Sequence, residues 1–321
     1  MKRILITGAL GQIGSELTPF LREKFGQDKV IASDIKKLPT EKKDLVEPFE
    51  EIDCLDASQI FRIVQKYQID TIFHLAAILS ARGEENPQLA WKVNINGLYN
   101  ILEVAKENHC LVFTPSSIAA FGPSTPKKNT PQETIQRPNT IYGLTKVSGE
   151  LLCDYYHLKY GLDTRGVRFP GIISYVTLPG GGTTDYAVDI FYAALRNKKY
   201  NCFLKKDTRL DMLYMPDALK AILDIMQADP ARLRYRNAYN ITAESFTPEE
   251  LAREIKKHIP DFEITYTVDP LRQSIADSWP DKLDDQAARE DWGWSPDYDL
   301  QKMTEDMIKK LKDKLSTKLV K

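Results

Sequence analysis

The stretch TGALGQIG, residues 7–14, follows the apolar run RILIT at residues 3–7 and precedes a helical pattern. Its glycines Gly8, Gly11 and Gly14 have the spacing G-x-x-G-x-x-G. Such a turn lets the backbone approach a pyrophosphate with no Cβ between them, and the next helix directs its first N–H groups at the phosphates. The glycines alone also suit a plain strand–helix turn. Together with the strand before them, they predict a dinucleotide-binding turn.

A second signal comes from the next apolar run, VIASD, which ends at Asp34. Asp34 lies about as far beyond the glycines as the acid that binds a ribose 2′-hydroxyl in dinucleotide-binding folds. A carboxylate there repels a 2′-phosphate, so the predicted cofactor is NAD. Lys36 and Lys37 follow closely, and their charge leaves tolerance of NADP open.

The pattern of apolar runs predicts the fold class. Nearly continuous apolar runs are typical of parallel strands covered on both faces, and here they alternate with helical stretches. We expect an α/β fold with a Rossmann-type, doubly wound, mostly parallel sheet and a small C-terminal α/β subdomain for the substrate. The predicted NAD-binding domain is 1–172, with part of 212–242 returning to it, and 173–321 is mainly substrate-binding. The predicted strands are 3–7, 30–33, 71–77, 111–117 and 163–170, and two long helices are predicted at 86–109 and 142–160.

The composition excludes several other classes of protein. The 321 residues carry a net charge of −1, which gives no overall attraction to nucleic acid or anionic lipid. No apolar run reaches the ~18 residues that a membrane span needs, and no signal peptide precedes the first strand. The four cysteines have no CxxC or zinc-type spacing, so no metal site is predicted. We therefore expect a cytoplasmic protein with no nucleic-acid or membrane partner.

A catalytic pair is suggested by Tyr142 and Lys146, which lie four residues apart and share one helix face. A phenol with a pKa of about 10 is a poor base at neutral pH, and a neighbouring ammonium is expected to lower that pKa. A cationic, oxidised nicotinamide would act in the same direction. Tyr-x-x-x-Lys is also common as an ordinary exposed pair. Ser116 and Ser117 add weight, because they end a predicted strand at the edge where open α/β sheets bind ligands.

These motifs together resemble the extended short-chain dehydrogenase/reductase superfamily over nearly the whole chain. The matching stretches are TGALGQIG (7–14), FHLAA (73–77), PSS before AAFG (115–122) and YGLTK (142–146). The resemblance implies that Tyr142 is the acid/base, that Lys146 lowers its pKa and holds the nicotinamide ribose, and that Ser117 binds the reacting oxygen. Many relatives have Thr at the position of Ser117, which keeps the hydroxyl.

A closer resemblance is to the short-chain-type L-threonine 3-dehydrogenases, which are related to nucleotide-sugar 4-epimerases. It is carried by HLAAILSARGEENP (74–87), VRFPGIISY (167–175), GGTTDYAVDIFY (181–192), MLYMPDALKAI (212–222) and ADSWP (276–280). It implies oxidation of L-threonine by NAD to 2-amino-3-oxobutanoate. The substrate residues that it implies are Ser80, Ser117, Tyr142, Gly171 and Thr184. The cofactor residues that it implies, beside Asp53 at the adenine, are Gly8, Gly11, Gln12, Ile13, Gly14, Asp34, Cys54, Leu75, Ala76, Ala77, Asn94, Tyr142, Lys146 and Ile172.

Two other functions fit the same motifs less well. A nucleotide-sugar 4-epimerase would share the Tyr, Lys and Ser set but would need a basic, aromatic groove for a nucleotide diphosphate. A non-catalytic NAD sensor would have no use for that set. Relatives pair the helices corresponding to 86–109 and 142–160 between subunits, so a homodimer is expected, although burial against the sheet explains the same apolar pattern.

Several single residues have structural interpretations. His74 lies within a strand and is expected to be a satisfied core histidine. Trp91 and Trp279 are expected to pack in the interior, and Trp279 also to close the pocket. Arg168 is expected to pair with a buried acid that the sequence does not identify, and Asp185 to be a helix N-cap. The triple glycine 180–182 is expected to form a mobile flap.

Overall fold

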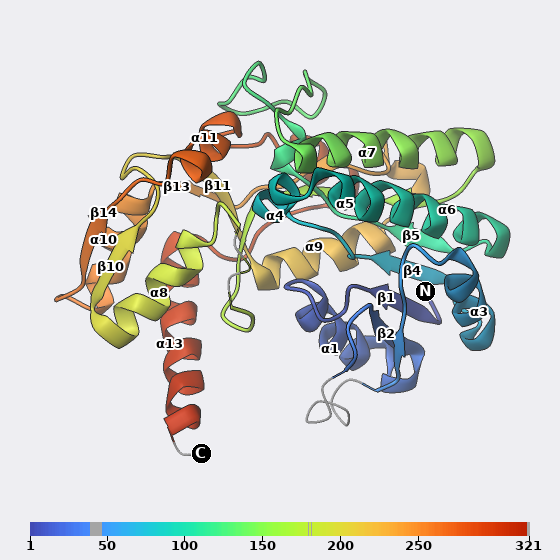
Figure 1. The fold of residues 1–321 in the computed structure, drawn as a ribbon, viewed down its shortest axis with the longest axis horizontal. Coiled ribbons are helices and arrows are strands. Elements are labelled where there is room, and N and C mark those ends of the chain that lie inside the picture. Colours follow the sequence, from blue (N-terminus) through green and yellow to red (C-terminus); the bar gives the residue numbers. More distant parts are fainter. Residues whose placement is uncertain (39–46, 179, 181, 320–321) are drawn as a thin grey trace.

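A parallel sheet forms the centre of the computed structural model, which describes residues 1–38, 47–178, 180 and 182–319 (Figure 1). Its strands are ordered β3-β2-β1-β4-β5-β7. They are β1 (Ile4–Thr7), β2 (Val30–Asp34), β3 (Phe49–Glu51), β4 (Thr71–His74), β5 (Leu111–Phe113) and β7 (Thr164–Arg165). Every pairing is parallel. The order reverses direction at β1 and β4, so the predicted doubly wound, Rossmann-type fold is confirmed.

Shorter sheets continue from the end of this sheet toward the ligand edge. One has the order β12-β8-β6, with β6 (Ser116–Ser117), β8 (Val167–Phe169) and β12 (Tyr239–Asn240). Another has the order β13-β11-β9, with β9 (Gly171–Ile173), β11 (Leu210–Tyr214) and β13 (Glu244–Phe246). A third pairs β10 (Lys199–Cys202) with β14 (Glu263–Tyr266). Only the β11–β13 pairing is antiparallel in the described chain.

Alternating side chains of the central strands build a separate apolar core on each face. Leu5, Ile31 and Ile72 point to one face, which α3 (Ala57–Tyr67), α6 (Gly97–Asn108) and α7 (Ile141–Tyr160) cover. Ile4, Ile6 and Phe73 point to the other face, which α1 (Gly14–Phe25) and α9 (Met215–Gln227) cover. Burial on both faces explains why these strands read as continuous apolar runs.

Some predicted elements are divided in the structure. The predicted strand 111–117 is two strands, β5 and β6, because Pro115 between them has no N–H to donate to a ladder. The predicted helix 86–109 is α5 (Pro87–Trp91), a π-helical turn η3 (Lys92–Asn96) and α6, preceded by α4 (Ser80–Glu85). Such π-turns occur frequently at functional sites, and Asn94 lies in this one.

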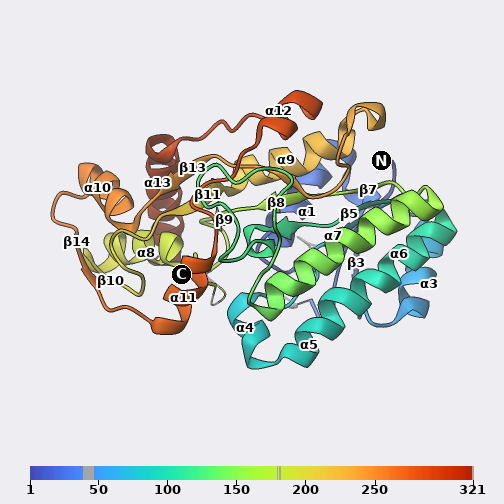
Figure 2. The same cartoon turned by 90° about the horizontal axis from the view of Figure 1, so that it is seen from above.

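The C-terminal part forms a third apolar core beside the ligand edge of the sheet (Figure 1). Its helices are α8 (Tyr186–Asn197), α10 (Pro248–His258), α11 (Pro270–Ser278) and α13 (Leu300–Leu319). α12 (Gln286–Trp292) instead lies near α9 (Figure 2). Short 3-10 turns are η1 (Gln27–Lys29), η4 (Ile118–Ala120) and η5 (Pro230–Arg232). No helix among the described residues is both long and apolar enough to cross a bilayer.

Candidate active site

The turn between β1 and α1 leaves no room for side chains at two of its glycines. A Cβ on Gly8, which has φ +73°, would lie 2.7 Å from the backbone nitrogen of Ala76. A Cβ on Gly14 would lie 2.3 Å from the carbonyl oxygen of Gly8. No side chain caps the N-terminus of α1; the nitrogens of Ser15 and Glu16 donate to the carbonyl oxygens of Gly11 and Ile13, and the positive end of the helix dipole is directed at the turn. This tight cradle fits the pyrophosphate of NAD.

Asp34 is held in a fixed orientation at the end of β2. Its two carboxylate oxygens accept hydrogen bonds from the backbone nitrogens of Leu10 (3.0 Å) and Lys36 (3.1 Å). Asp53 and Cys54 follow β3, the strand beside β2; the carboxylate of Asp53 accepts from the nitrogen of Leu55. Asp34 therefore lies where an acid can bind an adenosine ribose, in agreement with NAD.

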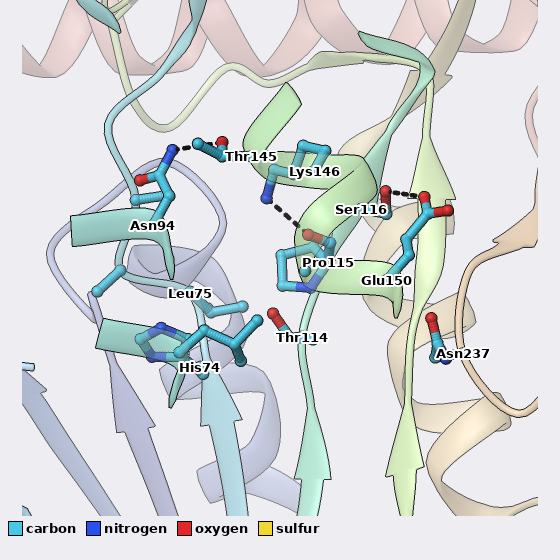
Figure 3. A pocket seen from close by; sticks show the side chains of 14 residues that line it. His74, Leu75, Asn94, Thr114, Pro115, Ser116, Thr145, Lys146, Glu150 and Asn237 are labelled. Atoms are coloured by element: carbon cyan, nitrogen blue, oxygen red, sulfur yellow. Dashed lines mark hydrogen bonds between the residues drawn. The ribbon is translucent and has the colours of Figure 1, made fainter. Parts of the chain in front are cut away.

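A cleft of about 840 Å³, including its open mouth, lies at the carboxyl edge of the strands. Its lining brings together most of the predicted reaction-end residues. They are Gln12, Ile13, Leu75, Ala77, Ser80, Ser117, Tyr142, Lys146, Gly171, Ile172 and Thr184. Ala76 and Asn94 line a second cavity of about 460 Å³, which shares Leu75, Ala77, Ser116 and Lys146 with the first (Figure 3). No cluster of three or more His, Cys, Asp or Glu suited to a metal occurs among the described residues.

Tyr142, Ser117 and Lys146 meet in this cleft from two elements. Thr140 caps the N-terminus of α7 through the nitrogen of Gly143 (3.0 Å), which fixes the turn that carries Tyr142. The Ser117 hydroxyl lies near enough to Tyr142 to favour its phenolate. The ammonium of Lys146 lies 5.4 Å from the centre of the Tyr142 ring. It donates to the carbonyl oxygen of Pro115 at 2.7 Å (Figure 3).

The expected lowering of the phenol pKa by Lys146 is wrong for the protein by itself. Burial raises the pKa of Tyr142 to about 12, and the Ser117 hydroxyl opposes that rise. Burial also lowers the pKa of the Lys146 ammonium to about 8. The ammonium points to the Pro115 carbonyl, so desolvation outweighs its attraction for a phenolate. In the protein by itself, the Tyr142 phenol is therefore neutral near pH 7.

His74 and Asn94 hold the wall of the second cavity in place (Figure 3). The Nδ1 atom of His74 lies 2.8 Å from the hydroxyl of Thr7, and burial lowers the pKa of this imidazole to about 3. His74 is therefore a neutral core histidine, as predicted. The Nδ2 atom of Asn94 donates to the hydroxyl of Thr145 (3.0 Å), which links η3 to α7 beside Lys146.

The opposite wall of the cleft carries hydroxyl groups. Ser80 is buried at the start of α4, and Trp279 is buried in the lining, as expected. A Cβ on Gly171 would lie 2.7 Å from the methyl group of Thr184, so the Thr184 side chain packs directly against the Gly171 backbone. The buried hydroxyl of Thr183 has no hydrogen-bond partner within the described chain.

Two expectations about this wall have other outcomes. Asp185 is not an N-cap through its side chain; its carboxylate instead accepts from the nitrogen of Gly182 at 2.6 Å and closes the preceding turn. The expected glycine flap includes Gly181, which lies outside the described residues.

The acid that Arg168 was expected to find is Glu150, one turn beyond Lys146 on α7. Arg168 donates to both carboxylate oxygens of Glu150, at 2.8 and 3.0 Å, and both side chains are buried. Sequence reasoning did not single out Glu150. The signal was present, because Tyr142, Lys146 and Glu150 recur at intervals of four residues.

The fold and this site define the class of the protein. Residues 4–242 match the NAD dependent epimerase/dehydratase family, so the chain belongs to this family of extended short-chain dehydrogenases/reductases. It is an NAD-dependent oxidoreductase, and NAD is its cofactor.

Individual relatives give a finer comparison. An uncharacterized epimerase/dehydratase of Staphylococcus haemolyticus is 52% identical over 99% of this chain and 100% of its own length. The structure is similar to that of L-threonine dehydrogenase from Clostridium difficile, with 60% identity, a TM-score of 0.95 and coverage of 98% of both chains. It is also similar to a monomeric L-threonine 3-dehydrogenase from a metagenome, with 49% identity, a TM-score of 0.93 and coverage of 97% and 99%.

Proposed function

We propose that this protein is an L-threonine 3-dehydrogenase, which converts L-threonine and NAD to 2-amino-3-oxobutanoate, NADH and a proton. The observation that carries the proposal is the meeting of Tyr142, Ser117 and Lys146 in one cleft, beside a cradle that fits NAD. The 60% identical structure of an L-threonine dehydrogenase, matched over nearly all of both chains, supports the choice of substrate.

In the proposed reaction, the chain's own residues move one proton and orient the substrate. When bound, oxidised NAD would supply the acceptor for the hydride from threonine Cβ and a positive charge near the phenol. Tyr142 takes the proton from the threonine hydroxyl, and Ser117 holds that oxygen by a hydrogen bond. Lys146 holds the nicotinamide ribose and keeps positive charge near the phenol. General-base catalysis of this type contributes about 10²–10⁴-fold in rate.

The remaining predicted site residues take binding roles in this proposal. Ser80 and Thr184 hold the amino-acid head group, with Gly171 giving Thr184 its room. Gly8, Gly11 and Gly14 receive the pyrophosphate, Asp34 the ribose and Asp53 the adenine. Contacts along the rest of the cofactor are assigned to Gln12, Ile13, Cys54, Leu75, Ala76, Ala77, Asn94 and Ile172.

The lining of the cleft favours a small zwitterion over a nucleotide sugar. Its described charged residues are Lys146 and Asp185, and the others are apolar, hydroxyl or amide groups. A nucleotide diphosphate carries at least two negative charges, which Arg and Lys side chains bind strongly. Lys146 is already committed to the reaction centre. The described cleft therefore supports an amino-acid substrate better than the epimerase alternative.

The test is an absorbance assay at 340 nm with NAD and a panel of L-threonine, L-serine, L-allo-threonine and a UDP-hexose. We expect NADH to accumulate with L-threonine in proportion to the substrate consumed. Conversion of the UDP-hexose without net NADH would instead identify an epimerase. Binding of NAD with no turnover of any member would favour an NAD-sensing protein.

We also propose a division of the chain into an NAD-binding domain, 1–172 with part of 212–242, and a mainly substrate-binding subdomain, 173–321. The third apolar core, built mostly from residues after 172, supports this division. We place the protein in the cytoplasm, because all four cysteines are free and buried, as is usual in a reducing compartment.

We propose a homodimer formed through α5, α6 and α7, which lie side by side in both views (Figures 1 and 2). Large apolar side chains on their outer surfaces are exposed in the single chain. They are Leu89, Trp91, Tyr99, Leu144, Leu151, Tyr155, Leu158 and Tyr160. Contiguous exposed apolar surface of this kind is typical of subunit interfaces. Trp91 is thus on the surface, contrary to the expectation that it packs in the interior.

Sedimentation velocity tests the dimer. Leu158, which is 83% exposed on α7, is changed to Glu, and we expect the chain to shift from dimer to monomer. The matched control is Leu271→Glu on α11, also exposed but outside this surface. A monomeric wild-type chain, as in the metagenome relative, would overturn the proposal.

A further inference from the structure

A buried polar cluster lies directly behind Lys146. Glu150, on the next turn of α7, accepts hydrogen bonds from the hydroxyl of Ser116, from Gln136 (2.7 Å) and twice from Arg168 (Figure 3). Arg168 also donates to the side-chain oxygen of Asn240 (3.1 Å). The cluster binds α7 to β6 and β8, and Ser116 and Arg168 are register partners in those two strands.

The hydrogen bond between Glu150 and Ser116 connects the cluster to the proposed reaction centre. Ser116 lies between Pro115, whose carbonyl oxygen accepts from the Lys146 ammonium, and Ser117, which lines the cleft with Tyr142. Glu150 therefore holds the short strand that presents both groups. It also lines the same cavity as Lys146, with no ion pair between them in the described chain, because its oxygens are occupied by other donors.

We propose that Glu150, held by Arg168, is a positioning residue that fixes the Pro115–Ser117 strand end and places a carboxylate in the cavity that Lys146 lines. This proposal about Glu150 rests on the proposed function only where turnover of L-threonine is measured. Its first measurement uses the protein without substrate or cofactor.

Among the described groups that face Lys146, Glu150 is the one carboxyl group. The titratable groups that face it are Tyr142, Glu150 and Cys153 on α7 and His74 on β4, with Arg168 of β8 behind Glu150. Burial keeps Tyr142, Cys153 and His74 neutral at pH 7, because it raises the pKa of the phenol and the thiol and lowers that of the imidazole. Burial lowers the pKa of Lys146, and the charge of Glu150 opposes that lowering.

The decisive experiment measures the titration of Lys146 by ¹³C NMR of protein labelled at lysine Cε, with the signal assigned through Lys146→Met. We expect a wild-type midpoint near pH 8. In Glu150→Gln the amide keeps a hydrogen-bond acceptor but loses the charge, and the midpoint should fall by about one pH unit. A folded Glu150→Gln protein with the wild-type midpoint would overturn the proposal.

Glu150→Gln leaves Arg168 without a buried counter-charge and could prevent folding. The double variant Glu150→Gln/Arg168→Gln leaves no unpaired charge, and its Lys146 midpoint should also fall. An unchanged midpoint in the folded double variant would equally overturn the proposal. The matched control is Asp291→Asn, which removes another buried carboxylate paired with an arginine, Arg234, far from the cleft. Its midpoint should equal that of the wild type.

Measurements of kcat separate the two parts of the Glu150 role, which are its charge near Lys146 and its hold on the Pro115–Ser117 strand end. In Glu150→Gln the alkaline limb of the kcat profile should move to lower pH, because Lys146 loses its proton earlier. Ser116→Ala keeps the Glu150 charge but removes the hydrogen bond between Ser116 and Glu150 that holds the strand. Because one hydrogen bond is lost, kcat should fall about tenfold, and the Lys146 midpoint should not change. Wild-type kcat in Ser116→Ala would contradict the strand-holding part. If the wild type does not oxidise L-threonine, the proposed substrate is wrong, but the NMR test of Glu150 is unaffected.

Discussion

The two ends of the ligand groove are built in different ways. The proposed nucleotide end rests mainly on residues 7–34, with Asp53 and Cys54 after β3, and its described hydrogen bonds involve backbone atoms, such as the nitrogens of Leu10 and Lys36 on Asp34. The reaction end is assembled from α4, β6, α7, β9 and the turn before α8, and its critical contacts involve side chains. A local stretch of sequence can therefore encode a cofactor cradle, whereas a reaction centre depends on how distant elements pack.

The largest effect is expected at the reaction end, from Tyr142→Phe. Removal of the hydroxyl removes the general base, so kcat for L-threonine should fall by about 10²–10⁴-fold. The Kd for NAD, measured by fluorescence titration, should stay within about twofold, because the nucleotide end is built from other residues. Tyr156→Phe on the same helix, whose hydroxyl bonds Glu103, should keep wild-type kcat. Wild-type turnover in Tyr142→Phe would contradict the mechanism.

His74 joins the two ends, since it contacts Thr7 beside the glycine turn and lines the cavity of Lys146. Its pKa is about 3 in the folded protein and about 6.5 when unfolded, so the unfolded chain binds the extra proton between these values. Stability should therefore fall as the pH drops below about 6.5, by about 3 kcal/mol at pH 4 from this group. His74→Gln should flatten that part of the profile in urea unfolding. An equally steep profile in the variant would contradict the assignment.

At the nucleotide end, Gly14→Ala should weaken NAD binding by about tenfold or more, a cost of roughly 1.4 kcal/mol. Its Cβ would lie 2.3 Å from the Gly8 carbonyl oxygen, so the cradle must open. The control is Gly161→Ala, at φ +68° with nothing within 4 Å of the new Cβ. It should lower stability by about 1 kcal/mol and leave the NAD Kd unchanged. Equal Kd values in all three proteins would refute the cradle.

The smallest effect is expected from Gly171→Ala. A Cβ there meets the Thr184 methyl group at 2.7 Å and the sulfur of Met212 at 2.4 Å, and these side chains can move. We expect the KM for L-threonine to rise by about three- to tenfold, with an unchanged Kd for NAD. Steady-state kinetics at saturating NAD measures the effect. A rise in the Kd for NAD instead would show that the two ends are not separable.

The fold and the shared helix face of Tyr142 and Lys146 could be predicted from the sequence because they rest on local patterns. The glycine spacing, the apolar runs of the central strands and the four-residue interval of Tyr142 and Lys146 each report short-range geometry. Pro115 lacks an N–H, so the sequence could have predicted the division of strand 111–117. It could not have predicted that the Pro115 carbonyl oxygen accepts a hydrogen bond from the Lys146 ammonium.

The sequence was enough to predict the parallel sheet and the glycine cradle. It also predicted an acid at the end of the second strand, Asp34, and the shared helix face of Tyr142 and Lys146. Only the tertiary structure decided that Arg168 pairs with Glu150, that Asp185 bonds Gly182, and that burial raises the pKa of Tyr142. The physical reason is range: helix and strand periodicity depend on near neighbours, whereas desolvation and ion pairing depend on what elements far along the chain bring to the same place.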